Sequence, residues 1–206
     1  QFLDGRFLIN KTQTGHETLQ LPEPWGETEF IHSQHSEPLT VPFADGIRDK
    51  GIREFTWKLH LPKREHEIWV GLVKAGFGDF ETPLDVKGVS LRPSEMLDAV
   101  VRHNMEVRAG DIPEQENHEI HLAIGEGTRD GKGLRVRVHV TSGADPLYEG
   151  YHDAGTSMNA SIAAQLMLRG RSRPGVWAPE EFFDVEDYFA ELRKRRFTIA
   201  VEETAL

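Results

Sequence analysis

The stretch EIHLAIGEGTRDGKGLRVRVHV, residues 119–140, is the strongest indicator of the fold. On both sides of its glycine-rich centre, apolar residues alternate with polar ones: first Ile120, Leu122 and Ile124, then Leu134, Val136, Val138 and Val140, interleaved with Arg135, Arg137 and His139. A period of two is typical of a strand with one buried and one solvated face. The stretch therefore predicts an antiparallel hairpin, with GEGTRDGKG (125–133) as a long turn.

The glycine-rich centre of this hairpin does not fit a nucleotide-binding loop. A dinucleotide fingerprint follows a strand and opens a helix, whereas residues 125–133 are flanked by two predicted strands. Neither a GxGxxG nor a P-loop motif occurs in the chain. We therefore expect the chain to carry no nucleotide-binding motif of its own.

Helices and further strands are predicted on both sides of the hairpin. Apolar residues recur at helical spacing in four segments, the last capped by Asp184: 64–75, 93–103, 157–169 and 185–196. Strands are predicted in four others: 27–32, 52–61, 86–91 and 198–202. The prolines in 35–42 favour an extended or loop conformation. This order predicts an α+β fold, with helices packed on one face of a mixed, largely antiparallel sheet.

The same patterns predict the core and the domain organisation. We divide the chain into an irregular lead-in over 1–26, a sheet-forming domain over 27–150 and a helical C-terminal segment over 151–206. The core is expected to include the apolar residues that face inward in the predicted elements: Phe55, Trp57, Leu59, Leu72, Leu97, Val100, Leu122, Ile124, Val136, Val138, Ile162 and Leu166.

Composition excludes several classes of function. The net charge of −10, from 24 basic and 34 acidic residues, argues against nucleic-acid binding and against attraction to an anionic membrane. Without cysteine the chain can form no disulfide and use no thiolate chemistry. No apolar run approaches the ~18 residues of a membrane span, and the start lacks the pattern of a signal peptide. We expect a cytoplasmic protein, excised or processed from a longer one because it lacks an initiator Met.

Metal binding and hydrolysis are disfavoured by residue spacing. His32 and His35, like His118 and His121, are three residues apart and would point to opposite faces of a strand, so no metal site is expected. No GxSxG motif is present around Ser157 or elsewhere, which argues against nucleophilic hydrolysis. The basic run 193–196 is explained as the C-terminal end of a helix.

The start of the helix predicted at 157–169 is the candidate binding site. Thr156, Ser157 and Asn159 crowd polar groups around a helix N-terminus, which offers free N–H groups to a carboxylate or phosphate. His152 and Asp153 precede them and could bond beside a ligand. A plain helix cap with small residues for close packing is an equally good interpretation.

The C-terminal third resembles the saccharopine dehydrogenase family, including its lysine-6-dehydrogenase-like members. The resemblance rests on the order of short motifs in 155–195: a threonine with small residues, an alanine-rich helix with AAQ, a glycine, PGV followed by a proline and acids, and a helix rich in Glu, Leu and Lys. HSEPLTVP (35–42), the strand at 52–61 and GVSLRPSEMLDAV (88–100) resemble further family segments. The similarity spans most of residues 27–196.

This resemblance implies a role in an NAD- or NADP-dependent oxidoreductase that acts on an amine or secondary amine of an amino acid by hydride transfer. It implies that the chain is the substrate-binding and dimerisation domain, inactive without an N-terminal Rossmann domain that binds the cofactor. We therefore expect a homodimer, no cofactor site in this chain, and substrate contacts from seven residues: Thr156, Ser157, Asn159, His152, Asp153, Ser36 and Glu37.

Two questions stay open at the level of sequence. The family usually has Thr-Gly-aromatic-Pro where this chain has Thr156, Ser157, Met158 and Asn159, so the substrate is not fixed by the resemblance. The alternative function is a non-catalytic domain of the same fold that assembles with other chains or binds a small acid. The exposed strand residues Arg135 and Arg137 could serve either an anion or a subunit contact.

Overall fold

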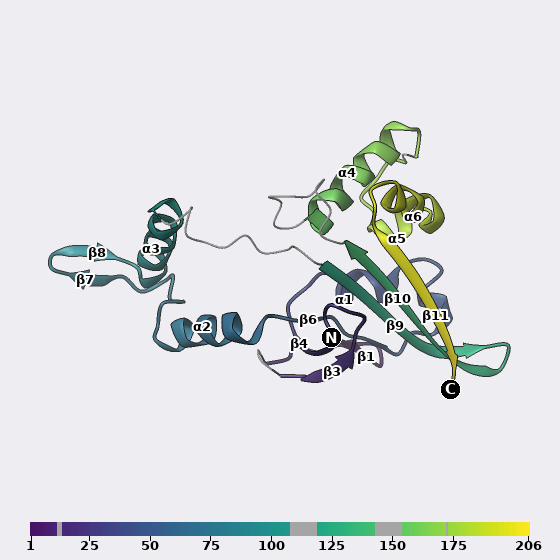
Figure 1. Cartoon of the computed structure of the whole chain (residues 1–206), viewed down its shortest axis with the longest axis horizontal. Helices are drawn as coiled ribbons and strands as arrows, with labels where there is room; N and C mark the ends of the chain where they lie inside the picture. Colours follow the sequence, from purple (N-terminus) through teal and green to yellow (C-terminus); the bar gives the residue numbers. More distant parts are fainter. Residues whose placement is uncertain (12–13, 108–118, 143–153, 172) are drawn as a thin grey trace. The chain divides into compact units, whose positions relative to one another are not determined.

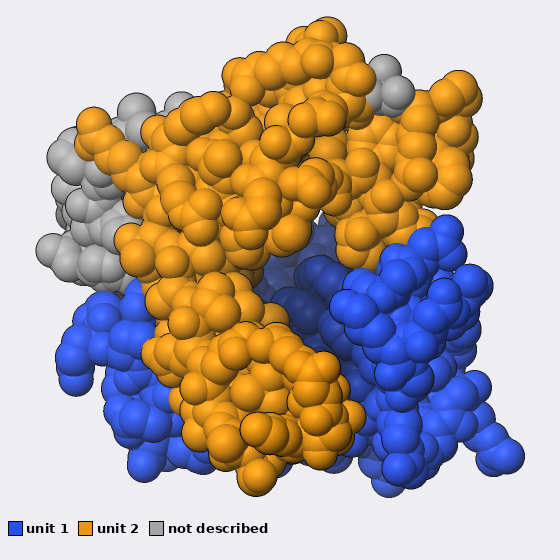
Figure 2. Space-filling model, turned by 90° about the vertical axis from the view of Figure 1, so that its right-hand side faces the viewer, with its two compact units in different colours: residues 1–114 blue, residues 115–206 orange. Residues whose placement is uncertain are grey.

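The structure is a computed structural model that describes residues 1–11, 14–107, 119–142, 154–171 and 173–206 (Figure 1). The chain divides into an N-terminal unit, Gln1–Glu114, and a C-terminal unit, Gln115–Leu206, coloured separately in Figure 2. The expected boundaries at 26/27 and 150/151 do not coincide with this division. The reason is that the predicted hairpin pairs with a strand at the end of the chain and so belongs with the C-terminal helices.

The α+β class is confirmed. Among the described residues, the strands form four small sheets instead of the one sheet that the sequence led us to expect. Every strand pair in these sheets is antiparallel. The antiparallel character was therefore predictable from local patterns, whereas the number of sheets depends on which short strands meet.

The N-terminal unit contains two three-stranded sheets. The first orders its strands β2 (Arg6–Phe7), β1 (Phe2–Leu3) and β5 (Glu54–Phe55). The second orders them β3 (Glu17–Gln20), β4 (Glu27–His32) and β6 (Lys58–Leu59). The strand expected at 27–32 is confirmed as β4. The lead-in over 1–26 is not irregular throughout, because it supplies three strands that are too short to show an alternating pattern.

Two other expectations for this unit are wrong. The strand expected at 52–61 is divided into β5 and β6, which join different sheets. The segment 35–42, expected to be extended or a loop, forms helix α1 (Glu37–Thr40) and enters the 3-10 turn η1 (Val41–Phe43). A second 3-10 turn, η2 (Arg48–Lys50), follows. Proline is tolerated in the first turn of a helix, where its missing N–H has no partner to lose, and both α1 and η1 place a proline there.

The second half of the N-terminal unit contains helix α2 (Lys63–Lys74), a hairpin of β7 (Leu84–Val86) and β8 (Val89–Leu91), and helix α3 (Pro93–Val107). Both helices confirm the sequence expectation. The single strand expected at 86–91 is instead a hairpin, because Lys87 and Gly88 both adopt positive φ and turn the chain. All residues of α2 and α3 are described, and none of them is buried.

The C-terminal unit is built on the predicted hairpin. Strands β9 (Glu119–Arg129) and β10 (Lys132–Ser142) pair along their whole length, and β11 (Thr198–Ala205) pairs with the other edge of β10 (Figure 1). The hairpin is confirmed, but the long turn is wrong. Asp130 and Gly131, with φ of 53° and 75°, make a two-residue turn of the kind that Asp-Gly favours, and the strands continue to its edges.

Two antiparallel helices pack on this sheet. Helix α4 (Ala154–Leu168) lies along α6 (Val185–Lys194), and the short α5 (Pro179–Phe182) precedes α6. The predicted cap of α6 is confirmed, since the Asp184 carboxylate accepts hydrogen bonds from two backbone N–H groups, both at 3.0 Å. A buried cluster joins the helices to the strands through Val140 and Ile199: its members are Ile162, Leu166, Leu192 and Phe197.

Most of the expected core is less buried than the sequence suggested. Ile162 and Leu166 are confirmed as core residues. Leu59, Val100 and Ile124 are exposed, and the other expected core residues are half-buried: Phe55, Trp57, Leu72, Leu97, Leu122, Val136 and Val138. The elements that carry these residues are short or lie in small sheets, where little of each apolar face is covered. On β10 the face expected to be solvated is partly covered instead, because His139 is 5% exposed.

Candidate functional site

The start of α4 meets the chain's own carboxylate. The backbone N–H of Gly155 donates to Oε2 of Glu119, in β9, at 2.8 Å. A negative charge is favourable at a helix N-terminus, where unpaired N–H groups and the helix dipole create a partial positive charge. Glu119 therefore occupies one of the positions in which a ligand carboxylate was expected.

Gly155 allows this approach because it has no side chain. A Cβ at this position would lie 2.3 Å from Glu119 Oε2 and 2.9 Å from His121 Nε2. His121 Nε2 is itself 4.0 Å from Glu119 Oε2, and its side chain is 57% exposed, against 18% for Glu119. These three residues form what we call the α4 N-terminal cluster: Glu119, His121 and Gly155.

Sequence reasoning missed Glu119 and His121. The sequence did contain evidence for this pair. Residues two apart on a strand point to the same face, so Glu119 and His121 must lie together on β9. Their meeting with Gly155 is a long-range contact that no local pattern reveals.

The three main candidates of the sequence analysis lie on the first turns of α4. Thr156 and Ser157 are exposed next to the α4 N-terminal cluster. Asn159 is directed instead toward α6, because its Oδ1 accepts a hydrogen bond from the Tyr188 hydroxyl at 2.9 Å. Burial raises the pKa of Tyr188, so its hydroxyl keeps the proton that it donates. Asn159 therefore links the two helices.

The secondary candidates fall in two other places. Ser36 and Glu37 belong to the N-terminal unit, at the start of α1, where the Ser36 hydroxyl lies 3.5 Å from Oε2 of Glu37. The same carboxylate contacts Nδ1 of His35, whose ring stacks on Trp57 at a centroid distance of 3.9 Å. His152 and Asp153 lie outside the described residues.

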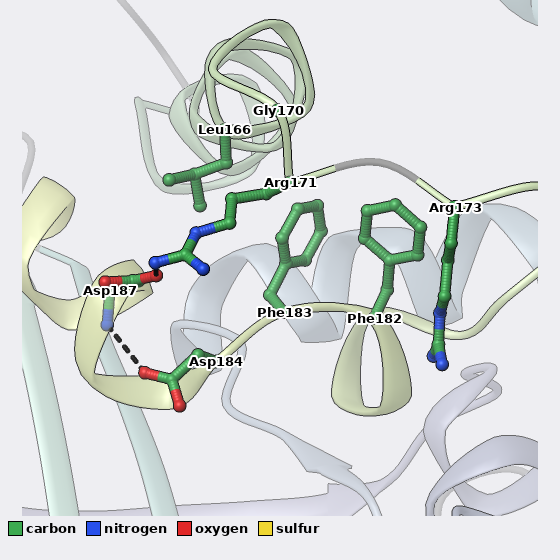
Figure 3. Close-up of a pocket in the computed structure, with 8 residues that line it drawn as sticks. All are labelled: Leu166, Gly170, Arg171, Arg173, Phe182, Phe183, Asp184 and Asp187. Atoms are coloured by element: carbon green, nitrogen blue, oxygen red, sulfur yellow. Dashed lines mark hydrogen bonds and ion pairs between the residues drawn. The ribbon is translucent and has the colours of Figure 1, made fainter.

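The C-terminal unit also contains a cavity between α4 and α6. It has a volume of about 250 Å³, and the side chains that line it are apolar and charged in similar number (Figure 3). Across it, Arg171 Nη2 donates to Oδ2 of Asp187 at 2.6 Å. Its lining residues are Leu166, Gly170, Arg171, Arg173, Phe182, Phe183, Asp184 and Asp187.

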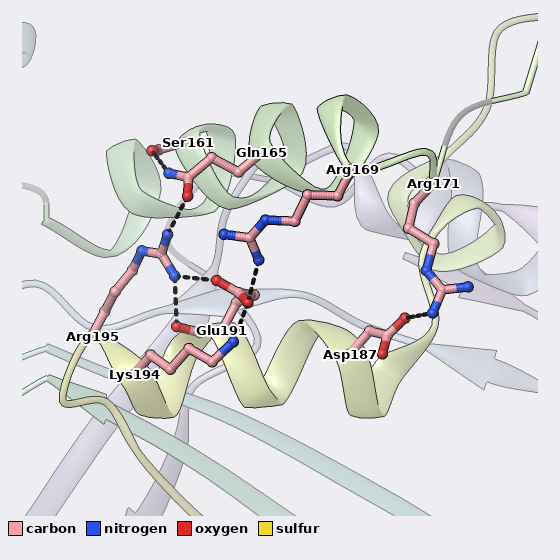
Figure 4. Close-up of polar contacts among 8 residues, drawn as sticks. All are labelled: Ser161, Gln165, Arg169, Arg171, Asp187, Glu191, Lys194 and Arg195. Atoms are coloured by element: carbon pink, nitrogen blue, oxygen red, sulfur yellow. Dashed lines mark hydrogen bonds and ion pairs between the residues drawn. The ribbon is translucent and has the colours of Figure 1, made fainter.

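A buried carboxylate lies beside this cavity and binds three cations (Figure 4). Oε1 of Glu191 accepts hydrogen bonds from Arg169 Nη1 at 2.7 Å and from Lys194 Nζ at 2.6 Å, and Oε2 accepts from Arg195 Nη1 at 2.8 Å. The hydrogen bonds from Arg195, Lys194 and Arg169 lower the pKa of Glu191 to about 2, so it stays ionised at neutral pH. The basic run 193–196 thus ends a helix, as expected, and also binds a buried acid.

Three further findings limit the chemistry of the described residues. No group of three or more His, Asp or Glu side chains among them is arranged to hold a metal ion. The glycine-rich stretch 125–133 lies in β9, the two-residue turn and β10, so it does not have the strand–loop–helix geometry of a dinucleotide-binding loop. Among the helices that the structure describes, none has the length and apolar character needed to cross a membrane.

No protein-family model matches the chain, and no curated protein gives a significant match.

Proposed function

We propose that the chain is the substrate-side domain of a saccharopine-dehydrogenase-like, NAD(P)-dependent oxidoreductase that acts on an amino-acid amine by hydride transfer. The proposal rests on one observation above all. The family-like motifs in 155–195 occur in the expected order, and their described parts form α4, the Gly170 stop, the PGV turn and α6 of a single unit.

The α4 N-terminal cluster suggests how such a domain would bind an amino acid. Glu119 uses Oε2 for the Gly155 amide, and a carboxylate next to a solvent-facing histidine is suited to an amine or ammonium group. Thr156 and Ser157 add hydroxyl groups for the polar end of the substrate. In this proposal Glu119 orients the amine, and the exposed His121 ring, with Nε2 4.0 Å from Glu119 Oε2, lies beside it as a second polar contact.

We assign no cofactor contact to the described residues. Their glycine-rich stretch does not fit a dinucleotide pyrophosphate, so we assign no step of the hydride transfer to them. In the proposed enzyme, a Rossmann domain supplies NAD or NADP, and the residues of this chain bind and orient the substrate.

Calorimetric titration with NADH and NADPH tests the proposal. The full-length gene product should bind one of the two cofactors, and the 206-residue chain alone should bind neither. If the full-length product binds neither, the oxidoreductase proposal is contradicted. In an active protein, Thr156→Ala should weaken substrate binding by about 1 kcal/mol, the typical value of a hydrogen bond. Thr204→Ala, on exposed β11, is the matched control and should leave the Michaelis constant unchanged.

A second candidate function is a non-catalytic assembly domain, favoured by the apolar surface of α2 and α3. Their exposed residues include Ile68 (53%), Trp69 (51%) and Val73 (63%) on α2, and Val100 (47%) and Met105 (58%) on α3. Exposed apolar residues that gather on a surface commonly mark an interaction site. Light scattering of the chain alone should then show a dimer or larger assembly. A monomer at all concentrations would contradict this candidate and the homodimer expected from the resemblance.

A further inference from the structure

The three cations around Glu191 leave an excess of positive charge at the surface. Arg169, Lys194 and Arg195 surround a single carboxylate that is 5% exposed. The ion pair of Arg171 with Asp187 beside them adds no net charge. The local excess is therefore two positive charges, in a chain whose net charge is −10.

This excess is carried by two of the three cations. The Arg195 side chain is 17% exposed and also donates to the Glu191 carbonyl and to Gln165 Oε1, so it serves the contact between the helices. Arg169 and Lys194 are 55% and 63% exposed. Each makes one hydrogen bond to the carboxylate, although a guanidinium has five N–H donors and an ammonium has three.

Glu191 also holds these two cations side by side. Because both donate to the same oxygen atom, Oε1, two like charges are fixed next to each other at the surface. A second anion on their solvent side would reduce their repulsion and meet donors already in position. The buried carboxylate therefore prepares the two cations for an anion.

The two cations open onto a cavity of about 410 Å³. Its lining includes Arg169, Lys194 and Arg171, with Glu191 at its inner side. It shares Leu166, Gly170, Arg171 and Asp187 with the cavity of Figure 3, so the two adjoin. The cavity of Figure 3 adds the rings of Phe182 and Phe183. A doubly charged binding position thus lies next to an aromatic one.

We propose that the cleft between α4 and α6 binds the phosphate group of a small phosphorylated molecule. The phosphate contacts Arg169 and Lys194, and the organic part lies against Phe182 and Phe183. A phosphate monoester is doubly charged near neutral pH, which matches the local excess of two positive charges. The inference concerns residues away from the α4 N-terminal cluster, so it does not depend on the proposed oxidoreductase function.

The test is a titration of the 206-residue chain with inorganic phosphate and with phenyl phosphate, followed by calorimetry and by NMR chemical shifts. Ionic strength is held constant with sodium chloride. Both ligands should bind saturably, and phenyl phosphate should bind several-fold more tightly. Shifts that sodium chloride reproduces would overturn the proposal. Equal affinity for the two ligands would overturn the part assigned to the aromatic rings.

Matched variants locate the binding. Lys194→Gln and Arg169→Gln should each weaken phosphate binding about tenfold, as expected for a charged hydrogen bond. Arg193→Gln removes an exposed cation from the same turn of α6, where Arg193 lies over the Phe189 ring, and should have no effect. If Arg193→Gln weakens binding as much as Lys194→Gln, general surface charge is responsible and the proposal fails. Circular dichroism checks that each variant is folded. If Arg169→Gln does not fold, Lys194→Gln still tests the proposal.

Discussion

Two helical regions of this chain bury their apolar residues to different extents. Helices α4 and α6 of the C-terminal unit bury Ile162, Leu166 and Leu192 against each other and the sheet. Helices α2 and α3 of the N-terminal unit carry regular apolar stripes, yet bury no residue. Helix α4 has no clear apolar stripe despite the helical spacing expected for 157–169, because apolar residues lie on all of its sides.

The comparison shows that a sequence can form a helix without burying the apolar face of that helix. A period of 3.6 residues predicts a helix and its apolar face, but it does not supply a surface to cover that face. In the C-terminal unit that surface follows directly in the chain, because α6 and β11 return to α4. Tertiary packing, more than local pattern, therefore decides which helices contribute to stability.

The largest expected effect follows from removing buried volume. Ile162→Ala leaves a cavity at a fully buried position and should lower the free energy of unfolding of the C-terminal unit by about 2–5 kcal/mol. Ile68→Ala in α2, at a position 53% exposed, should change stability by less than about 0.5 kcal/mol. Hydrogen exchange, measured on peptides from α4 and α2, reports each unit separately. Equal effects would show that the two regions do not differ in the way described.

A smaller effect concerns pH and the carboxylate between α4 and α6. The hydrogen bonds from Arg195, Lys194 and Arg169 lower the folded-state pKa of Glu191 from 4.5 to about 2. Its contribution is therefore fully present above about pH 4.5 and is lost as pH falls toward 2. Glu191→Gln should destabilise the C-terminal unit at pH 7, less than Ile162→Ala does, and should flatten the loss of stability between these two pH values.

Urea unfolding of the wild type and the variant across this pH range gives the measurement. Glu203→Gln serves as the control, because Glu203 pairs with Arg129 on the exposed surface of β11, where an ion pair contributes little. A Glu191→Gln variant whose pH dependence parallels that of the wild type would show that the carboxylate does not couple the helices.

The smallest effect tests the close approach at the start of α4. Gly155→Ala would place a Cβ 2.3 Å from Glu119 Oε2. Because the glutamate side chain can rotate away, the expected cost is the lost Gly155–Glu119 hydrogen bond, about 1 kcal/mol. Gly127→Ala on β9, where a Cβ would meet nothing within 4 Å, is the matched control. In a double-mutant cycle, Glu119→Ala should add little to Gly155→Ala, whereas additive effects would exclude a shared contact.

Local chemistry made part of the fold predictable. The alternation around residues 119–140 predicted the β9–β10 pair, and Asp184 predicted the start of α6. The long turn was wrong because the glycine content of 125–133 was given more weight than the Asp130–Gly131 pair, which carries the positive φ angles. The short strands β1, β2, β5 and β6 have two residues each, too few for any periodic pattern.

The unusual composition at the start of α4 was evident from the sequence, but the contacts made there were not. Small and polar residues around 155–159 marked the start of α4 as unusual. In this structure the glycine lets the Glu119 carboxylate approach the helix start, and the asparagine accepts a hydrogen bond from the Tyr188 hydroxyl. Both partners are distant in sequence, so a spacing rule could not identify them. The exposed positions of Thr156 and Ser157 agree with the expected location, and their contact with substrate stays a prediction.

The pairing of β10 has a consequence for the order of folding. Its contacts with β9 cross a two-residue turn, and β-hairpins form in roughly 1–10 microseconds. Its contacts with β11 join Thr141 to Thr198, so they require closure of a loop that contains α4, α5 and α6. Since such non-local contacts form late, we expect the hairpin to form before β11 joins the sheet. Because Phe197 of the buried cluster directly precedes β11, we expect the third strand and the helical core to form together.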